Sequence, residues 1–295
     1  MVKDSLDSVL IAGGGTLGAQ SALQFALHGK QVAIYGRSEE SIARAEQRVE
    51  RFRTPYINDT DFDEEAVATA IDSIEYTTEI SRAGDVDLVF ECVAETTEAK
   101  TAIYKALRPH LRPETVVATN SSTVLPSQLA PLLAFEAQFV AIHFANEIWK
   151  RPAAEIMGHP GTDASVFDQA QAFAAQVGMV PLPIYKERSG YILNSLLIPF
   201  VESALELWGA GVSDPKTIDK TWEIVMDSLG PFKVLDVIGM RTVYAVLKSR
   251  EAKGVPGTGE LAQVVMRDYI EQGRLGVEAG AGFYDYDDQG QAIVD

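Results

Sequence analysis

Two residues of complementary chemistry, His143 and Glu155, lie in short apolar segments that read as neighbouring β-strands, "AIHFAN" (141–146) and "AAEIM" (153–157). A carboxylate that is hydrogen-bonded to an imidazole fixes its tautomer and makes it a better proton acceptor. The pattern therefore predicts a histidine–carboxylate pair that works as a general base. Taken alone, it also fits a core histidine beside an unrelated glutamate.

Polar residues in other segments favour the catalytic interpretation. Asn120 and Ser122 follow the apolar run at 115–119, at the carboxyl end of a strand, where α/β proteins bind their ligands. Asn194 stands in the first turns of a strongly apolar segment (190–211), where an amide is costly to bury without a partner. We expect one cleft to gather side chains from these segments, namely Ser122, His143, Asn146, Glu155 and Asn194.

A glycine loop lies between a strand and a helix near the start of the chain. "SVLIAGGGTLGAQSALQFALHG" (8–29) leads into a second strand, "QVAIYG" (31–36), and together they form a βαβ unit. Gly13, Gly15 and Gly18 satisfy G-x-G-x-x-G, which permits a tight turn, approach of a pyrophosphate and close packing of helix on strand. The helix N-terminus then offers N–H groups to the phosphates. We predict a dinucleotide site on Gly13, Gly15, Thr16, Leu17 and Gly18.

The end of the second strand bears on the choice of dinucleotide. Proteins that bind NAD usually place an Asp or Glu there to hold the ribose hydroxyls. This chain has Gly36 instead, followed by Arg37 and Ser38. Arg37 can pair with a ribose 2′-phosphate and Ser38 can donate a hydrogen bond to it, which predicts a preference for NADP(H). Glu39 and Glu40 restore negative charge nearby, so NAD(H) remains the alternative.

Strand and helix patterns alternate in the first part of the chain, and long helical patterns replace them in the second. Alternation of this kind is typical of a parallel sheet with helices on both faces. We predict an α/β protein with a Rossmann-type doubly wound sheet in residues 1–187. An all-α domain is expected in residues 188–295.

Composition excludes several classes of protein. A net charge of −17 over 295 residues argues against a nucleic-acid binder, which needs a basic surface. The sequence predicts no membrane span and no secretory leader, because no apolar run is long enough and the N-terminal layout is wrong. Cys92 is the single cysteine, so we expect a reducing compartment and a cytoplasmic protein. The four histidines and Cys92 form no ligand-spaced cluster, so no metal site is predicted.

A series of motifs runs in a fixed order along nearly the whole chain. The glycine loop is followed by an E-x-x-x-x-K step from Glu95 to Lys100, an N-S-S turn at 120–122, H-F-x-N at 143–146 and Glu155. The helical part adds "GYILN", "PFVESALELWGAGVSDPKTID", "LGPFKVLDVIG" and "GAGFYDY". With these motifs in this order, the chain resembles the L-3-hydroxyacyl-CoA dehydrogenase family.

The resemblance implies an oxidoreductase that interconverts 3-hydroxyacyl-CoA and 3-oxoacyl-CoA, a reaction of fatty acid metabolism. It implies that His143 is the general base for the 3-hydroxyl proton while hydride leaves C3, and that Glu155 orients His143. Ser122 and Asn194 would be hydrogen-bond donors around the substrate oxygen.

The remaining implied roles concern the pocket, the cofactor and the assembly. Asn146 would help to shape the substrate pocket, and Glu95, Lys100 and Asn120 would lie near the cofactor. The helical domain would close over the substrate and form a homodimer, which suits the apolar segment at 190–211.

The chain departs from the family pattern on the substrate side. The family usually continues H-F-x-N with Pro and a further apolar–Pro step, whereas this chain has "EIWKRPAAEIM" (147–157). Ser189 stands where Pro is common, and Ser195 where Arg is usual. A free 3-hydroxy acid, as in the gulonate dehydrogenase and lambda-crystallin branch, is therefore the alternative substrate. A non-catalytic dinucleotide-binding protein is a further alternative, but the glycine loop together with the histidine–glutamate pair favours an enzyme.

Overall fold

The structure, a computed structural model, describes residues 5–287 and 290–293 of the chain. The chain divides between Ile192 and Leu193 into two compact units, and each unit is described by itself. The first unit has the predicted α/β fold and the second is helical, so the predicted fold class is confirmed. The boundary expected between residues 187 and 188 stays a prediction, as do the roles of the two domains.

One eight-stranded sheet forms the centre of the first unit, in the order β3-β2-β1-β4-β5-β6-β7-β8. Its strands are β1 (Ser8–Ala12), β2 (Gln31–Tyr35), β3 (Glu75–Thr77), β4 (Leu88–Glu91), β5 (Val116–Thr119), β6 (Phe139–Phe144), β7 (Ala153–Gly158) and β8 (Val180–Ile184). All neighbours pair in parallel except β6 and β7, which are antiparallel. From β1 the chain continues to β2 on one side and later to β4 on the other. This change of direction opens a crevice at the carboxyl ends of the strands, where α/β proteins bind ligands.

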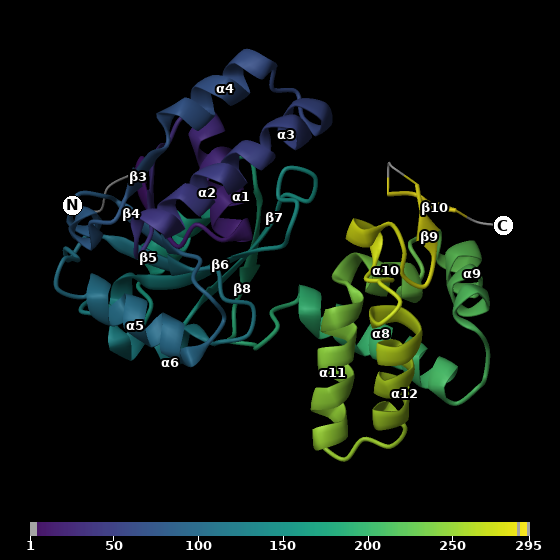
Figure 1. The fold of residues 1–295 in the computed structure, drawn as a ribbon. Helices are drawn as coiled ribbons and strands as arrows, with labels where there is room; N and C mark the ends of the chain where they lie inside the picture. The colour runs from purple at the N-terminus through teal and green to yellow at the C-terminus, as the bar shows by residue number, and fades with distance from the viewer. Residues whose placement is uncertain (1–4, 288–289, 294–295) are drawn as a thin grey trace. The chain divides into compact units, whose positions relative to one another are not determined.

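Helices cover both faces of this sheet. They are α1 (Thr16–Leu27), α2 (Glu39–Arg51), α3 (Arg53–Asp59), α4 (Glu64–Ser73), α5 (Thr97–Leu107), α6 (Pro126–Leu129) and α7 (Ala164–Gln176). Figure 1 shows α1 to α4 on one side of the sheet and α5 and α6 on the other. In β1, Val9 and Ile11 enter the core beneath α1, whereas Leu10 and Ala12 enter the core beneath α5. Because side chains alternate along a strand, a strand covered on both faces must be apolar throughout.

Several elements of the first unit are not predicted by the sequence patterns, among them β8, α3, β3 and the helices α6 and α7. β8 contains Pro181 and Pro183, which lack an N–H group, and it tolerates them because it is an edge strand paired only with β7. α3 carries Pro55 in its first turn, where the missing N–H removes no helical hydrogen bond. β3 has three residues, which is too short for a recognisable alternation.

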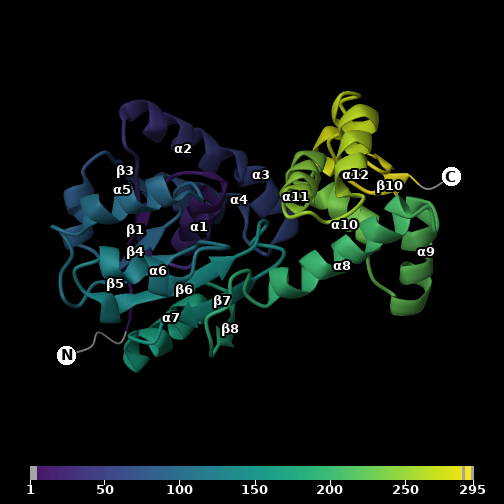
Figure 2. The same cartoon turned by 90° about the horizontal axis from the view of Figure 1, so that it is seen from below.

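The second unit is a cluster of helices followed by a short hairpin. It contains α8 (Leu193–Gly209), α9 (Pro215–Met226), α10 (Pro231–Ile238), α11 (Met240–Ala252), α12 (Thr258–Val265), β9 (Asp285–Tyr286) and β10 (Ala292–Ile293). The sequence predicts three helical segments after α8, and the described residues hold four α-helices there. Figures 1 and 2 show α11 and α12 packed side by side. No helix within residues 5–287 and 290–293 is both long and apolar enough to cross a membrane.

Buried carboxylates hold the closing "GAGFYDY" segment of this unit in place. Asp236 is buried in α10 and accepts hydrogen bonds from the Phe283 N–H (2.8 Å), the Tyr284 N–H (3.0 Å) and the Tyr286 hydroxyl (2.7 Å). Burial raises the pKa of the Asp236 carboxyl, and the hydrogen bonds to Phe283 and Tyr286 oppose that rise. The tail motif is therefore explained by the packing of the helical unit.

Candidate active site

His143 and Glu155 are directly opposite each other in the antiparallel pair of β6 and β7. His143 Nδ1 lies 2.9 Å from Glu155 Oε2, and each residue is 4% exposed. Opposite residues of an antiparallel pair project on the same face, so strand register alone brings the two side chains together. The carboxylate requires a donor, which assigns the proton to Nδ1 and leaves Nε2 as an acceptor.

Ser122 faces the second ring nitrogen of this histidine. Its Oγ lies 3.1 Å from His143 Nε2, in the loop that follows β5. With Nε2 as the acceptor, the Ser122 hydroxyl donates. The carboxyl ends of β5 and β6 and the facing strand β7 thus place a hydroxyl, an imidazole and a carboxylate in one hydrogen-bonded row, an arrangement suited to general acid–base chemistry.

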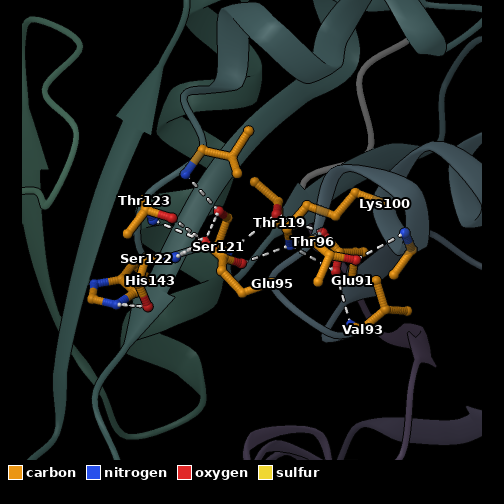
Figure 3. A network of polar contacts seen from close by, with 12 residues as sticks. Glu91, Val93, Glu95, Thr96, Lys100, Thr119, Ser121, Ser122, Thr123 and His143 are labelled. Carbon is orange, nitrogen blue, oxygen red and sulfur yellow. Dashed lines mark hydrogen bonds and ion pairs between the residues drawn. The ribbon is translucent and has the colours of Figure 1, made fainter. Parts of the chain in front are cut away.

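Glu95 holds the loop that carries Ser122, as Figure 3 shows. Its Oε1 accepts hydrogen bonds from the Ser121 hydroxyl (2.5 Å), the Ser122 N–H (3.0 Å) and both the N–H and the hydroxyl of Thr123 (2.9 and 2.8 Å). Burial disfavours the charge of Glu95, but these hydrogen bonds and the Lys100 ammonium outweigh it and lower its pKa to about 2. Glu95 therefore stays ionised and fixes the position of Ser122.

A buried ion-pair cluster lies behind Glu95 (Figure 3). Lys100 is 1% exposed, and its Nζ lies 3.0 Å from Glu91 Oε2 and 3.0 Å from Glu95 Oε2. Glu91 is 0% exposed and also accepts from the Tyr104 hydroxyl (2.9 Å) and the Thr119 hydroxyl (2.7 Å). Lys100 therefore contacts two carboxylates of the protein, and its predicted place near the cofactor stays a prediction.

Glu91 and its partners were not among the predicted site residues. The sequence carries one signal for them, because Glu91 interrupts the apolar run "DLVFECV" (87–93). A carboxylate within a buried strand needs several donors, and these can come only from neighbouring elements. Which residues supply them depends on the packing of α5 against β5, which the sequence does not reveal.

Tyr191 is a second residue that sequence reasoning does not find. Its ring stacks on the His143 imidazole with 4.5 Å between the ring centroids and 24° between the planes. The N–H of the next residue, Ile192, donates to Glu155 Oε1 at 2.8 Å. These contacts complete the surroundings of the histidine–glutamate pair within the first unit.

The remaining predicted site residues lie at different places. Asn120 Oδ1 accepts from the Phe144 N–H at 2.8 Å and so ties the loop after β5 to the end of β6. Asn146 is exposed, beyond the end of β6. Asn194 belongs to the second unit, in the first turn of α8. Their roles toward substrate and cofactor stay predictions.

The glycine loop has the shape that a dinucleotide requires. Gly13 has φ +115°, and a β-carbon on Gly18 would lie 2.0 Å from the Gly13 carbonyl oxygen, so the fold itself demands these two glycines. Gly15 differs, since its φ is −70° and a β-carbon there would meet no atom closer than 3.9 Å. Open space therefore lies at the N-terminus of α1, where Thr16 and Leu17 begin the helix and no side chain caps it. A pyrophosphate fits this place.

A side chain at the end of β2 would have to displace two neighbouring side chains of α2. A β-carbon on Gly36 would lie 2.5 Å from Ser41 Oγ and 2.8 Å from Ile42 Cδ1. Ser38 caps α2, because its Oγ accepts from the Ser41 N–H at 3.3 Å. Arg37 is exposed, and its guanidinium has no hydrogen-bond or ion-pair partner within the described residues.

Known proteins resemble both parts of the chain. The family model described as "3-hydroxyacyl-CoA dehydrogenase, NAD binding domain" matches residues 8–188, and "3-hydroxyacyl-CoA dehydrogenase, C-terminal domain" matches residues 190–286. A probable 3-hydroxybutyryl-CoA dehydrogenase of Deinococcus radiodurans is 26% identical and covers 94% of this chain and 99% of its own length. A similar protein of Bacillus subtilis is 25% identical over 96% of this chain.

Solved structures share the fold. A diketoreductase, described with the words "substrate-directed dual catalysis of dicarbonyl compounds", is 38% identical with a TM-score of 0.91, over 96% of this chain and 99% of its own. The (S)-3-hydroxybutyryl-CoA dehydrogenase of Ralstonia eutropha is 24% identical with a TM-score of 0.81, over 96% of this chain and all of its own (100%). With family models matching both units, this chain belongs to the 3-hydroxyacyl-CoA dehydrogenase family of nicotinamide-dependent oxidoreductases.

Proposed function

We propose that the chain oxidises and re-forms a 3-hydroxyl group, with His143 as the general base. The observation that carries this proposal is the row of Ser122, His143 and Glu155, with 3.1 Å and 2.9 Å between successive polar atoms. Nε2 is the ring nitrogen that can take a proton, because Nδ1–H is committed to the carboxylate. A substrate hydroxyl that replaces the Ser122 hydrogen bond meets a proton acceptor at Nε2, and the Ser122 hydroxyl is then free to donate to the substrate oxygen.

In the oxidation, the substrate loses a hydroxyl proton and a hydride, and its alcohol becomes a ketone. The hydroxyl proton passes to His143 Nε2, and the Glu155 carboxylate then faces an imidazolium, whose charge it stabilises. When bound, the nicotinamide supplies the hydride acceptor, or the hydride donor in the reverse direction. Ser122 is proposed to donate a hydrogen bond to the substrate oxygen. In the reduction, the imidazolium returns the proton to that oxygen.

The glycine loop is proposed to hold the dinucleotide. Gly15 leaves the space for the pyrophosphate, and the first turn of α1 supplies N–H groups to it. The family's NAD-binding domain covers this loop, so a nicotinamide dinucleotide is the cofactor class.

NADP(H) is the proposed preference, with Arg37 as its main cause. Gly36 stands where an acid would repel a 2′-phosphate, and the unengaged guanidinium of Arg37 directly follows it. Hydrogen bonds to charged groups contribute about 1.5–3 kcal/mol each, so a preference of roughly tenfold to a hundredfold is expected. Glu39 is exposed nearby and opposes it, whereas Glu40 is paired with Arg44.

The cofactor proposal is tested by titrating NADPH and NADH against wild type and Arg37→Ala by fluorescence. We expect a selective loss of NADPH affinity in the variant, largest at low salt. Arg51→Ala, at the far end of α2, removes the same charge from an exposed position and is the matched control. Tighter binding of NADH by wild type, or equal weakening of both cofactors by Arg37→Ala, would refute the preference.

A 3-hydroxyacyl-CoA is the proposed substrate, because family members that match along nearly the whole chain are named for it. A small dicarbonyl compound or a free 3-hydroxy acid is the second candidate. The observation that favours it is the diketoreductase, which is more similar to this chain than the CoA dehydrogenases compared above. The segment after Asn146, which departs from the family pattern, favours it too; in the structure Trp149 and Lys150 of this segment both contact Asp59 of α3 (3.0 and 2.9 Å).

A series of ketone substrates that share the acetoacetyl group, and differ only in what it is attached to, separates the two candidates. Reduction of acetoacetyl-CoA, of the acetoacetyl thioester of N-acetylcysteamine and of ethyl acetoacetate is followed by loss of the reduced nicotinamide, with NADH and NADPH in parallel. If CoA is recognised, kcat/KM falls steeply once the nucleotide part is removed. A flat series, or turnover of the ester alone, would favour the second candidate. No turnover in any arm, together with no oxidation of a free 3-hydroxy acid such as gulonate, would refute the proposed reaction.

The helical unit is proposed to form the contact of a homodimer. Besides the apolar segment of α8, it exposes a run of apolar side chains at the end of α9 and just beyond it, namely Ile224, Val225, Met226 and Leu229. Exposed apolar clusters of this kind mark interaction surfaces. Light scattering at micromolar concentration should give twice the chain mass, and a monomer would contradict this.

A further inference from the structure

The segment that leads from β8 into the second unit, called here the linker (residues 185–192), contacts His143, Glu155 and the residue that follows Ser122. The Ser189 hydroxyl donates to the Thr123 carbonyl at 2.7 Å, next to Ser122. The Ile192 N–H donates to Glu155 Oε1 at 2.8 Å. Between these two anchors stands Tyr191, which is 1% exposed.

Tyr191 covers one face of the His143 ring. The two rings are nearly parallel, with centroids 4.5 Å apart and an angle of 24° between their planes. The edges of the imidazole are already held by Glu155 and Ser122. A ring held at two edges and along one face has little freedom to rotate, and the stack also keeps water from that face.

The backbone at this point is in an uncommon conformation. Gly190 has φ +83° and Tyr191 has φ +54°, so two successive residues are left-handed. This region suits glycine, but a bulky residue rarely adopts it. Such an outlier persists only where the surrounding structure enforces it, and it is then a reasonable pointer to function. Here it directs the Tyr191 ring onto His143 while the next N–H reaches Glu155.

We propose that Tyr191 is a positioning residue for the reaction, which fixes His143 by stacking and Glu155 through the following peptide. The proposal rests on His143 being the base, as argued above. An aromatic face also attracts a cation, so the stack favours the imidazolium that forms when His143 takes the substrate proton. Tyr191 itself stays a neutral phenol, since burial and the charge of Glu95 raise its pKa.

The test compares the pH dependence of kcat/KM for alcohol oxidation in wild type, Tyr191→Leu and Tyr191→Phe. His143 contacts Glu155 on β7 and the Tyr191 ring, and the carboxylates whose charge acts on Tyr191 are Glu95 on the loop after β4, Glu155, Glu91 on β4 and Glu187 in the linker. None of the variants alters the carboxylates, so a change of profile reports on the ring. In Tyr191→Leu we expect kcat to fall on the order of tenfold, part of what a positioned base contributes. The midpoint of the acidic limb should move down by about half to one pH unit, because the cation loses its aromatic face.

Two controls identify the cause. Tyr191→Phe keeps the ring and should retain the wild-type midpoint, whereas Tyr185→Leu removes a tyrosine from an exposed position of the same linker and should change neither quantity. The Kd for the cofactor should stay at its wild-type value in all variants. If Tyr191→Leu does not fold, Tyr191→Met gives the same readout, because its flexible side chain can fill the space of the ring.

The outcomes separate this inference from the proposed function. A wild-type kcat and midpoint in the Leu or Met variant, beside an inactive His143→Ala enzyme, would overturn the role of Tyr191 and leave the base in place. Equal loss in Tyr191→Phe would also overturn it, since the ring is then not the cause. If His143→Ala retains activity, the proposed function fails first.

Discussion

Removal of the Lys100 ammonium is the perturbation whose size the structure defines best. Lys100→Met keeps a long apolar side chain but deletes the positive charge between Glu91 and Glu95. The Nζ is within 3.0 Å of an oxygen of each carboxylate, and the Lys100 and Glu91 side chains are 1% and 0% exposed. The variant thus leaves the Glu91 carboxylate buried with hydrogen-bond donors but without its counter-charge.

The expected cost follows from that burial. Breaking a buried ion pair by deleting one partner costs about 3–5 kcal/mol, because the remaining charge stays desolvated. Glu91 retains the hydroxyls of Tyr104 and Thr119, which places the expected loss toward the lower end of that range. For a unit of this size, each kcal/mol lowers Tm by roughly 2–4 °C, so a decrease of roughly 6–12 °C is expected.

The assay is thermal and urea unfolding of the enzyme without cofactor, with a double variant as the internal check. Glu91→Gln in the Lys100→Met background removes the unpaired charge, so the double variant should be more stable than the sum of the single losses predicts. Lys105→Met, on an exposed position of the same helix, is the matched control and should change the unfolding free energy by less than about 0.5 kcal/mol. If Lys100→Met behaves like Lys105→Met, or if the single losses simply add, the ion-pair reasoning is wrong.

Other substitutions test the base, the glycine loop and the clamp on Ser122. His143→Ala should lower kcat by about 10²–10⁴-fold and leave cofactor Kd unchanged, and a variant that keeps more than about a tenth of wild-type kcat would exclude His143 as the base. Gly15→Ala should keep the wild-type Tm, because its β-carbon meets no atom within 3.9 Å, yet it should weaken dinucleotide binding; unchanged Kd would place the pyrophosphate elsewhere. Glu95→Gln should have a lower free energy of unfolding than wild type above pH 4.5, the ordinary pKa of a glutamate, because the variant lacks the ionised carboxylate. The difference in unfolding free energy should shrink as pH falls toward 2, where Glu95 of the wild type becomes protonated. A deficit that stays constant across urea titrations in this pH window would contradict the lowered pKa.

The sequence predicts those strands of the sheet that are apolar and bounded by turns. It does not predict strands whose residues, such as proline, are unfavourable in most strands. β1, β2 and β6 are found because their residues are apolar on both faces, as parallel strands require. β8 is missed because Pro181 and Pro183 argue against any strand except an edge strand, and position in the sheet is not visible in the sequence.

The same distinction applies to the site. His143 and Glu155 can be paired from sequence because each lies in its own apolar strand segment and both side chains are polar. Tyr191 cannot be found in that way, since its position depends on two left-handed residues in the linker. Glu91 stands between these cases, because a lone carboxylate in an apolar run indicates buried partners without identifying them.

The residues proposed for catalysis and the segment proposed to select the substrate are held in place by different features of the fold. The proposed base and its carboxylate are set by the register of β6 and β7, and Ser122 is set by the Glu95 clamp, so small changes in loops leave them in place. The segment after Asn146 is not set by strand register. Its Trp149 and Lys150 contact Asp59 of α3, and the sequence of α3 gives no sign of that contact. Family membership therefore constrains the type of reaction more tightly than it constrains the identity of the substrate.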